Sequence, residues 1–254
     1  MATERYKSAR FWDARYHQER MLAIWTVLHS LLKPADLFLD AGCGTGEYLA
    51  LAATVPRVSA YGVDLSRNYL RRAQDTEGEV VRADVSHLPF RDSAFGVVLC
   101  SEVIEHIEKP KDTATELFRT AERSVVVTTP NFGLMRFIMR LLSGRLIDQL
   151  DESVGHVSIQ KVGTWSAMLA PNGWAIELQR TCHVVPPILS QMHIPTPFAR
   201  PVDYLEKALN KLLPLMGNIS ILVFRNKKTN AQSLVLSTSI STLIDSRSAR
   251  QGAK

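Results

Sequence analysis

Apolar and polar residues alternate along the first half of the chain in blocks that predict helices and strands in turn. Apolar positions recur at helical spacing within residues 11–32, and Pro34 ends that helix. Short apolar runs then predict five strands, at 37–40, 58–64, 78–85, 94–100 and 124–130. Helical patterns follow the first, second and fourth of these strands, which predicts a parallel sheet with helices on both faces.

Polar residues at the starts of two helical patterns support this prediction. Ser66 is well placed to cap a helix that begins near Asn68. Thr113 and Glu116 have the spacing of a capping box, which predicts a helix that starts at Thr113. Because ligands of such sheets bind at the carboxyl ends of the strands, the residues that follow each strand are the candidates for chemistry.

The pattern changes after Asn131. Residues 162–174 predict a helix ended by Asn172 and Gly173, and residues 175–181 and 218–226 predict two more strands. The segment 183–215 is apolar, and five of the twelve prolines fall between Pro186 and Pro201, which predicts a lid or docking insert. We therefore expect an α/β fold, a Rossmann-like, doubly wound, mostly parallel seven-stranded sheet with helices on both faces.

Composition and charge narrow the class of protein. Apolar residues make up 46% and charged residues 22% of the chain, as in ordinary soluble globular proteins. The net charge of +5 is spread along the sequence. No apolar run is long enough to cross a bilayer, and the charged N-terminus lacks a signal-peptide core. Three scattered cysteines indicate reduced thiols, so we expect a cytoplasmic protein without a disulfide framework.

A glycine-rich loop follows the first predicted strand. The segment LDAGCGTG contains Gly42, Gly44 and Gly46, whose missing Cβ atoms let the backbone turn sharply and let a ligand lie against it. A dinucleotide site would have the spacing G-x-G-x-x-G, whereas the spacing here is G-x-G-x-G, preceded by Asp40. A carboxylate at this position repels a pyrophosphate and suits a ligand with a cationic end.

LDAGCGTG resembles motif I of the class I S-adenosylmethionine-dependent methyltransferases, in their type 11, ubiquinone-biosynthesis-like branch. The segments YGVDLS, RADVSHLPF, FGVVLCSEVIEHI and VVVTTPN resemble later motifs, in family order. The resemblance covers residues 36–131 well and residues 150–225 loosely. It implies one methyltransferase domain over 1–226, with capping helices in 1–33, a cofactor-binding half in 36–131 and an acceptor-side half in 132–226. A disordered polar tail is expected at 227–254.

The resemblance also implies S-adenosyl-L-methionine as the cofactor and gives roles to individual residues. Asp64 would accept hydrogen bonds from both ribose hydroxyls, Asp84 would hold the adenine amino group, and Val85 would offer its backbone N–H. The backbone around Ser101 would flank the methionine part. The implied cofactor-binding residues are Asp40, Ala41, Gly42, Cys43, Gly44, Gly46, Asp64, Leu65, Asp84, Val85 and Ser101.

Candidates for acid–base chemistry cluster in SEVIEHIEKP. An O or N acceptor has to lose a proton to a base during methyl transfer. Glu102, Glu105 and His106 would share one face of a helix that began at Ser101. We predict His106, as a base or orienting group, and Glu102 as catalytic residues. The E-x-x-E-H spacing also resembles a divalent-metal site of small-RNA 2′-O-methyltransferases, with His156 as a fourth ligand. We assign no metal at this point, because EHI also ends this strand in metal-free methyltransferases.

The expected function is methyl transfer to an O, N or C atom of a small-molecule or lipid-linked acceptor. The apolar insert would cover this acceptor. That insert could instead contact a membrane surface or a second subunit, and the oligomeric state is open. We expect no nucleic-acid partner, because the basic residues form no stripe interleaved with aromatics. Two alternatives are an RNA 2′-O-methyltransferase with a metal at E-x-x-E-H and a non-enzymatic assembly subunit of the same fold. The intact loop and Asp64 argue against the second.

Overall fold

The computed structural model describes residues 14–131, 141, 155–157, 160–182, 208, 212, 217 and 219–229. The helices are α2 (Ala14–Leu31), α3 (Glu47–Ala53), α4 (Arg67–Ala73), α5 (Pro110–Thr120), α8 (Val162–Leu169) and the short 3₁₀ helix η2 (Ile104–His106). The strands are β1 (Leu37–Ala41), β2 (Ser59–Asp64), β3 (Glu79–Arg82), β4 (Phe95–Ser101), β5 (Ala121–Pro130), β6 (Trp174–Cys182) and β7 (Ile219–Asn226).

The seven strands form one sheet in the order β3-β2-β1-β4-β5-β7-β6. The first five pair in parallel, and β7 lies antiparallel between β5 and β6. The predicted mostly parallel, seven-stranded, doubly wound sheet is therefore confirmed. Strand order reverses between β1 and β4, the place where such sheets open a crevice for ligands.

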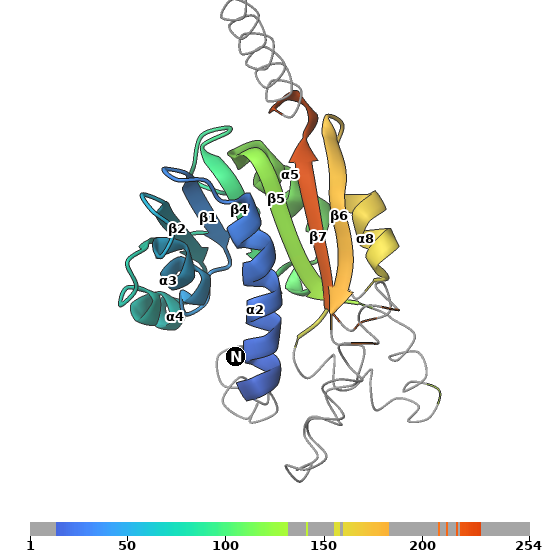
Figure 1. Cartoon of the computed structure of the whole chain (residues 1–254), viewed down its shortest axis with the longest axis horizontal. Helices are drawn as coiled ribbons and strands as arrows, with labels where there is room; N and C mark the ends of the chain where they lie inside the picture. The colour runs from blue at the N-terminus through green and yellow to red at the C-terminus, as the bar shows by residue number, and fades with distance from the viewer. Residues whose placement is uncertain are drawn as a thin grey trace, which may run out of the picture.

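Helices cover both faces of the sheet (Figure 1). On one face, Ile24 and Leu28 of α2 and Leu49 of α3 pack with Phe38, Val97 and other alternate strand residues. On the opposite face, Leu117 of α5 and Trp165 of α8 pack with the intervening strand residues, such as Val98 and Val125. Because successive side chains of a strand point to opposite faces, the apolar runs of β4 and β5 serve both cores.

Helix α4 begins as the sequence predicts, whereas α5 does not. The Ser66 side chain accepts a hydrogen bond from the backbone N–H of Tyr69, so the predicted cap is confirmed. The predicted helix start at Thr113 is wrong, because α5 begins at Pro110, with Lys109 as its N-cap. Proline has a fixed φ and no N–H, both of which suit the first helical turn.

The two residues of the predicted capping box serve other purposes. Thr113 is fully buried, and its hydroxyl lies 2.8 Å from that of Ser86. The Glu116 carboxylate accepts a hydrogen bond from the backbone N–H of Leu88 and pairs with Arg119. Both contacts tie α5 to the segment that follows β3.

Parts of the sequence prediction fall on residues that the structure does not describe. The insert at 183–215 lies outside the described residues apart from 208 and 212, and so do residues 1–13 of the predicted capping helices. Of the tail predicted at 227–254, residues 227–229 are described and are helical. Among the described residues, no helix has the length and apolar character needed to cross a membrane.

Candidate functional site

The loop between β1 and α3 has an unusual backbone. Gly42, Gly44 and Gly46 have φ angles of 90°, 52° and 83°, in the region that side chains rarely adopt. The backbone N–H groups of Gly42 and Cys43 both donate to the Val63 carbonyl, at 2.7 and 2.9 Å. The end of β2 therefore fixes the conformation of this loop.

Asp64 completes that attachment. One of its carboxylate oxygens accepts from the backbone N–H of Gly44 at 3.0 Å, and the other accepts from that of Ser66 at 2.7 Å. A carboxylate offers about four acceptor positions. Asp64 can therefore hold the loop and still accept two further hydrogen bonds from a ligand.

The three glycines differ in the space around them. A Cβ atom at Gly42 would overlap the Val103 side chain, and one at Gly46 would lie 2.9 Å from Thr76. At Gly44, by contrast, a Cβ atom would meet nothing within 4 Å. Packing thus requires glycine at positions 42 and 46, whereas the backbone at Gly44 borders open space.

Asp40 is a buried carboxylate without a hydrogen-bond partner among the described residues. Its side chain is 1% exposed, and neither oxygen accepts a hydrogen bond. Burial, followed by the negative charges of Asp64 and Glu47, raises the pKa of Asp40 to about 8. A buried charge without a partner is costly, and a cationic group nearby would relieve that cost. The carboxylate and the open backbone at Gly44 together fit a ligand with a positive end.

The other predicted cofactor residues surround this loop at the same edge of the sheet. Ala41 is the buried last residue of β1, and Leu65 follows Asp64 with 57% of its surface exposed. Asp84 follows β3, and its carboxylate accepts from the backbone N–H of Ser86 at 2.8 Å. Val85 beside it is buried. Parallel pairing of β1 with β2 and of β2 with β3 brings these positions to one edge.

The α-helix after β4 begins only at Pro110, so the predicted α-helical face of Glu102, Glu105 and His106 is wrong. Ser101 ends the strand, Glu102 has a φ of 55°, and only the single turn of η2 follows. The Glu102 carboxylate turns to Arg20 of α2, 3.3 Å away, and accepts from the Thr128 hydroxyl at 3.2 Å. Because Arg20 and Thr128 hold this carboxylate in place, the geometry favours a positioning role for Glu102.

Glu105, His106 and His156 lie together, each with a potential ligand atom within 4.8 Å of the others. Burial and the nearby Glu102 raise the pKa of Glu105 well above its usual range. Burial lowers the pKa of His106, and its Nδ1 lies 3.0 Å from the Gly155 carbonyl oxygen. A carbonyl only accepts, so Nδ1 carries the proton and the neutral ring has its lone pair on Nε2.

Sequence reasoning missed a polar contact between α2 and the site. The Nε2–H of His17 donates to the Glu47 carboxylate at 2.9 Å, and Arg20 contacts both the His17 ring and Glu102. The hydrogen bond with His17 is the main cause that lowers the pKa of Glu47. The i, i+3 spacing of His17 and Arg20 places both on one face of α2. That spacing is the only sequence signal of this contact, and it does not reveal that the partners are Glu47 and Glu102.

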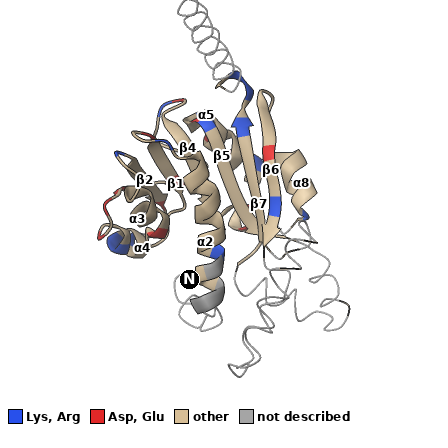
Figure 2. Ribbon diagram, in the orientation of Figure 1, with Lys and Arg blue, Asp and Glu red and all other residues tan. Residues whose placement is uncertain are grey.

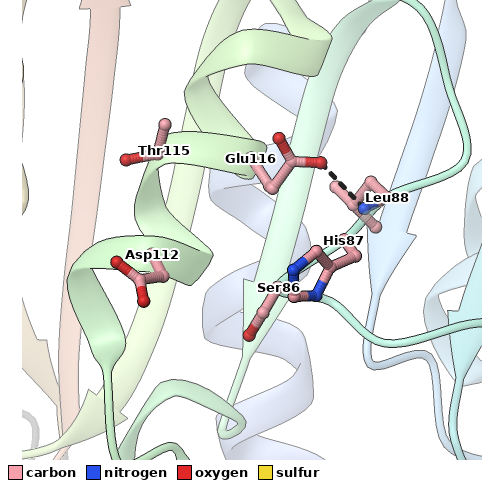
Figure 3. Close-up of a pocket in the computed structure, with 6 residues that line it drawn as sticks. All are labelled: Ser86, His87, Leu88, Asp112, Thr115 and Glu116. Atoms are coloured by element: carbon pink, nitrogen blue, oxygen red, sulfur yellow. Dashed lines mark hydrogen bonds between the residues drawn. The ribbon is translucent and has the colours of Figure 1, made fainter.

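A surface hollow of about 430 Å³ lies beside α5 (Figure 3). It is bounded by Asp112, Thr115 and Glu116 of α5 and by Ser86, His87 and Leu88. The Glu116 carboxylate that faces it is already bonded to the Leu88 N–H. The glycine loop does not line this hollow, so it is separate from the predicted cofactor site.

Known proteins resemble the half of the chain that contains the loop. The methyltransferase domain family matches residues 39–127. A probable tRNA methyltransferase 9B of Mus musculus is 27% identical over 165 residues, which are 56% of this chain and 35% of that protein. The 27-O-demethylrifamycin SV methyltransferase of Amycolatopsis mediterranei is 34% identical over 84 residues, 30% of this chain and 31% of that protein. The chain spans about a third of the length of each.

Among solved structures, magnesium protoporphyrin IX methyltransferase of Synechocystis PCC 6803 with bound SAH has a similar fold. The TM-score is 0.58 at 18% identity, and the match covers 83% of each chain. The fold, the family match and the chemistry of the glycine loop agree. Residues 39–127 are a methyltransferase domain, and the described fold is that of the class I S-adenosylmethionine-dependent methyltransferases, which supports S-adenosylmethionine as the cofactor.

Proposed function

We propose that this protein transfers a methyl group from S-adenosylmethionine to an O–H or N–H group of a small-molecule or lipid-linked acceptor. The observation that carries this proposal is the buried, unpartnered carboxylate of Asp40 beside an open glycine backbone. When bound, the cofactor supplies an already activated methyl group. The protein then has to provide alignment and a site from which water is excluded.

In this proposal the cofactor is held by the strand ends. Asp40 faces its positive end, the backbone at Gly44 leaves room for it, and Asp64 accepts from the ribose hydroxyls. Asp84 and Val85 serve the adenine ring, and Ser101 lies at the methionine part. The hydrogen bond between Gly44 and Asp64 supports this assignment, because it fixes the loop and the carboxylate relative to each other.

His106 is the residue that we propose to act on the acceptor. It lies after β4, and its lone pair on Nε2 can accept the proton of an O–H or N–H group. The lowered pKa of His106 keeps the ring neutral near pH 7, as a base requires. Glu102 acts indirectly, through its ion pair with Arg20. This supports an acceptor with an acidic proton over a carbon acceptor.

The class of acceptor rests on the sequence of residues 183–215. Its apolar residues and prolines support an apolar cover over a small or lipid-linked acceptor. We propose a cytoplasmic enzyme whose contact with a membrane surface is at most peripheral. Lys and Arg lie scattered among Asp and Glu over the described ribbon, which gives no support to an extended nucleic-acid surface (Figure 2).

RNA is the second candidate acceptor, because one relative is named a probable tRNA methyltransferase. The experiment that separates the two candidates uses labelled S-adenosylmethionine and cell extract divided into RNA, lipid and small-molecule fractions. We expect label in the small-molecule or lipid fraction, identified by mass spectrometry, and none with Asp64→Ala protein. Label in RNA would overturn the proposed acceptor class. Failure to bind S-adenosylmethionine would instead favour the non-enzymatic assembly subunit.

A further inference from the structure

Two histidines and a glutamate from separate segments meet after β4. Glu105 and His106 belong to η2, and His156 comes from a segment fifty residues later in the chain. The potential ligand atoms of all three lie within 4.8 Å of one another. The His106 and His156 rings are 5.0 Å apart at their centroids and tilted by 54°. A single ion between the three side chains would be within reach of each.

Glu105 supplies an independent reason to place a cation here. The side chain is completely buried, and neither oxygen accepts a hydrogen bond of ordinary geometry from the described residues. Its own backbone and the Thr129 hydroxyl interact favourably with it, and Glu102 is already paired with Arg20. A buried carboxylate is normally paired or bound to a metal. Among the described residues, Glu105 therefore forms no ion pair at the point where two imidazoles converge.

Two hydrogen bonds join the two segments that carry the cluster. The Nδ1–H of His106 donates to the Gly155 carbonyl at 3.0 Å, and the Val157 N–H donates to the Glu105 carbonyl at 2.8 Å. His156 is thus fixed on both sides of its backbone. Metal-binding histidines commonly donate their other ring N–H to a backbone carbonyl, which orients the ring and fixes the tautomer. In His106 this leaves Nε2 as the ligand atom.

We propose that Glu105, His106 and His156 form a binding site for one divalent transition-metal ion. Two imidazoles and one carboxylate match Zn²⁺, Mn²⁺ or Fe²⁺ better than Mg²⁺ or Ca²⁺, which prefer oxygen ligands. Three protein ligands leave coordination positions for oxygen atoms of another molecule. The site lacks Glu102, so it differs from the four-ligand set that the E-x-x-E-H spacing predicts.

The proposed metal site holds whether or not the protein transfers methyl groups. Its position after β4, next to Thr129 of β5, is where an acceptor would approach in a parallel sheet. A bound ion would occupy Nε2 of His106, so the metal and the proposed base role exclude each other at that nitrogen. An acceptor hydroxyl bound to the ion would be more acidic, so it could release its proton to solvent water without a protein base.

The test is a titration of tag-free, chelator-treated protein with Co²⁺, followed by visible absorption, and with Zn²⁺ in competition. We expect one saturable Co²⁺ site per chain, with the intense absorption of four- or five-coordinate cobalt, displaced by Zn²⁺. Glu105→Gln and His156→Asn should each weaken it by at least about 100-fold, more than the roughly 10–100-fold cost of losing an outer hydrogen-bond partner. His87→Asn and Glu108→Gln are matched controls at exposed positions and should bind Co²⁺ normally.

Two results would overturn the proposal. One is the absence of saturable Co²⁺ binding, and the other is unchanged binding in both Glu105→Gln and His156→Asn. Circular dichroism checks that the variants are folded, and His156→Asn decides alone if Glu105→Gln unfolds, because His156 is only part-buried. Binding of S-adenosylhomocysteine is measured on the same samples. Its loss with intact Co²⁺ binding would speak against the proposed function and not against the metal site.

Discussion

The guanidinium of Arg20 lies 3.3 Å from the carboxylate of Glu102 and so ties helix α2 to the end of β4. Both side chains are 16% exposed, which limits screening of the pair by water. Arg20 also contacts His17, which in turn meets Glu47 at the start of α3. One helix near the N-terminus is thus joined to the two segments that follow β1 and β4.

Breaking this ion pair should loosen α2. We expect Arg20→Ala and Glu102→Gln each to lower the free energy of unfolding, with a coupling of roughly 1–2 kcal/mol in the double-mutant cycle, between the values for exposed and buried pairs. Urea unfolding of the four proteins measures this coupling. Additive effects would show that the two charges do not stabilise each other.

The glycine loop makes opposite predictions for two of its positions. Gly44→Ala should cost only about 1–2 kcal/mol of stability, from its positive φ, because a Cβ atom meets no neighbour there. Gly42→Ala should cost at least about 3 kcal/mol, because overlap with Val103 adds to the backbone strain. Gly44→Ala should nevertheless weaken S-adenosylhomocysteine binding, measured by calorimetry, because the alanine side chain would occupy the open space beside this backbone. Unchanged binding would place the ligand elsewhere.

Asp64 should matter more for the ligand than any exposed carboxylate. We expect Asp64→Ala to weaken cofactor binding by about 10–150-fold, the equivalent of losing hydrogen bonds to a charged group worth roughly 1.5–3 kcal/mol. Calorimetric titration with S-adenosylmethionine measures the change. Asp75→Ala is the control, because Asp75 is an exposed aspartate beyond α4 and should bind normally.

Burial of Asp40 predicts how the stability of the ligand-free protein depends on pH. The pKa of this carboxyl is about 8 in the folded protein and 3.8 in its unperturbed state. Between these values the folded state holds a proton that the unfolded state has lost. The free energy of unfolding should therefore fall as pH rises from about 4 to about 8, by up to about 1.4 kcal/mol per pH unit.

Asp40→Asn should remove this part of the pH dependence, whereas Asp75→Asn at an exposed position should leave it unchanged. Urea unfolding at a series of pH values compares the three proteins. Parallel profiles for the wild type and Asp40→Asn would mean that Asp40 titrates normally.

A cationic ligand should change the protonation of Asp40. Because a nearby positive charge favours the ionised carboxylate, binding of S-adenosylmethionine near pH 7 should release a proton from this group. Calorimetry in buffers of different ionisation enthalpy measures the number of protons released. We expect a smaller release for Asp40→Asn; an equal release would assign the proton to another group.

The sequence predicts the parts of the site that the backbone dictates. Gly42, Gly44 and Asp64 could be identified because a tight turn after a buried strand needs glycine, and because parallel strands bring their ends together. Ser66 could be identified because its cap involves residues three apart in the sequence. The structure confirms the glycine turn, the parallel pairing and the cap, whereas the ligand roles of Gly44 and Asp64 stay predictions.

Contacts between distant segments could not be predicted in this way. The start of α5 at Pro110 depends on Thr113 and Glu116 bonding to the segment after β3, which overrides their capping-box spacing. The partner of Glu102 is Arg20, which comes from a helix eighty-two residues earlier in the chain. No periodicity within SEVIEHIEKP contains that information.

The position of β7 has a consequence for how the chain folds during synthesis. All seven residues from Ser124 to Pro130 of β5 pair with β7. Among the described residues, β6 also pairs with β7. The ribosome therefore releases β6 well before the strand that joins it to the sheet. Until residues 219–226 emerge, the valines of β5 form an open sheet edge that other nascent chains could pair with.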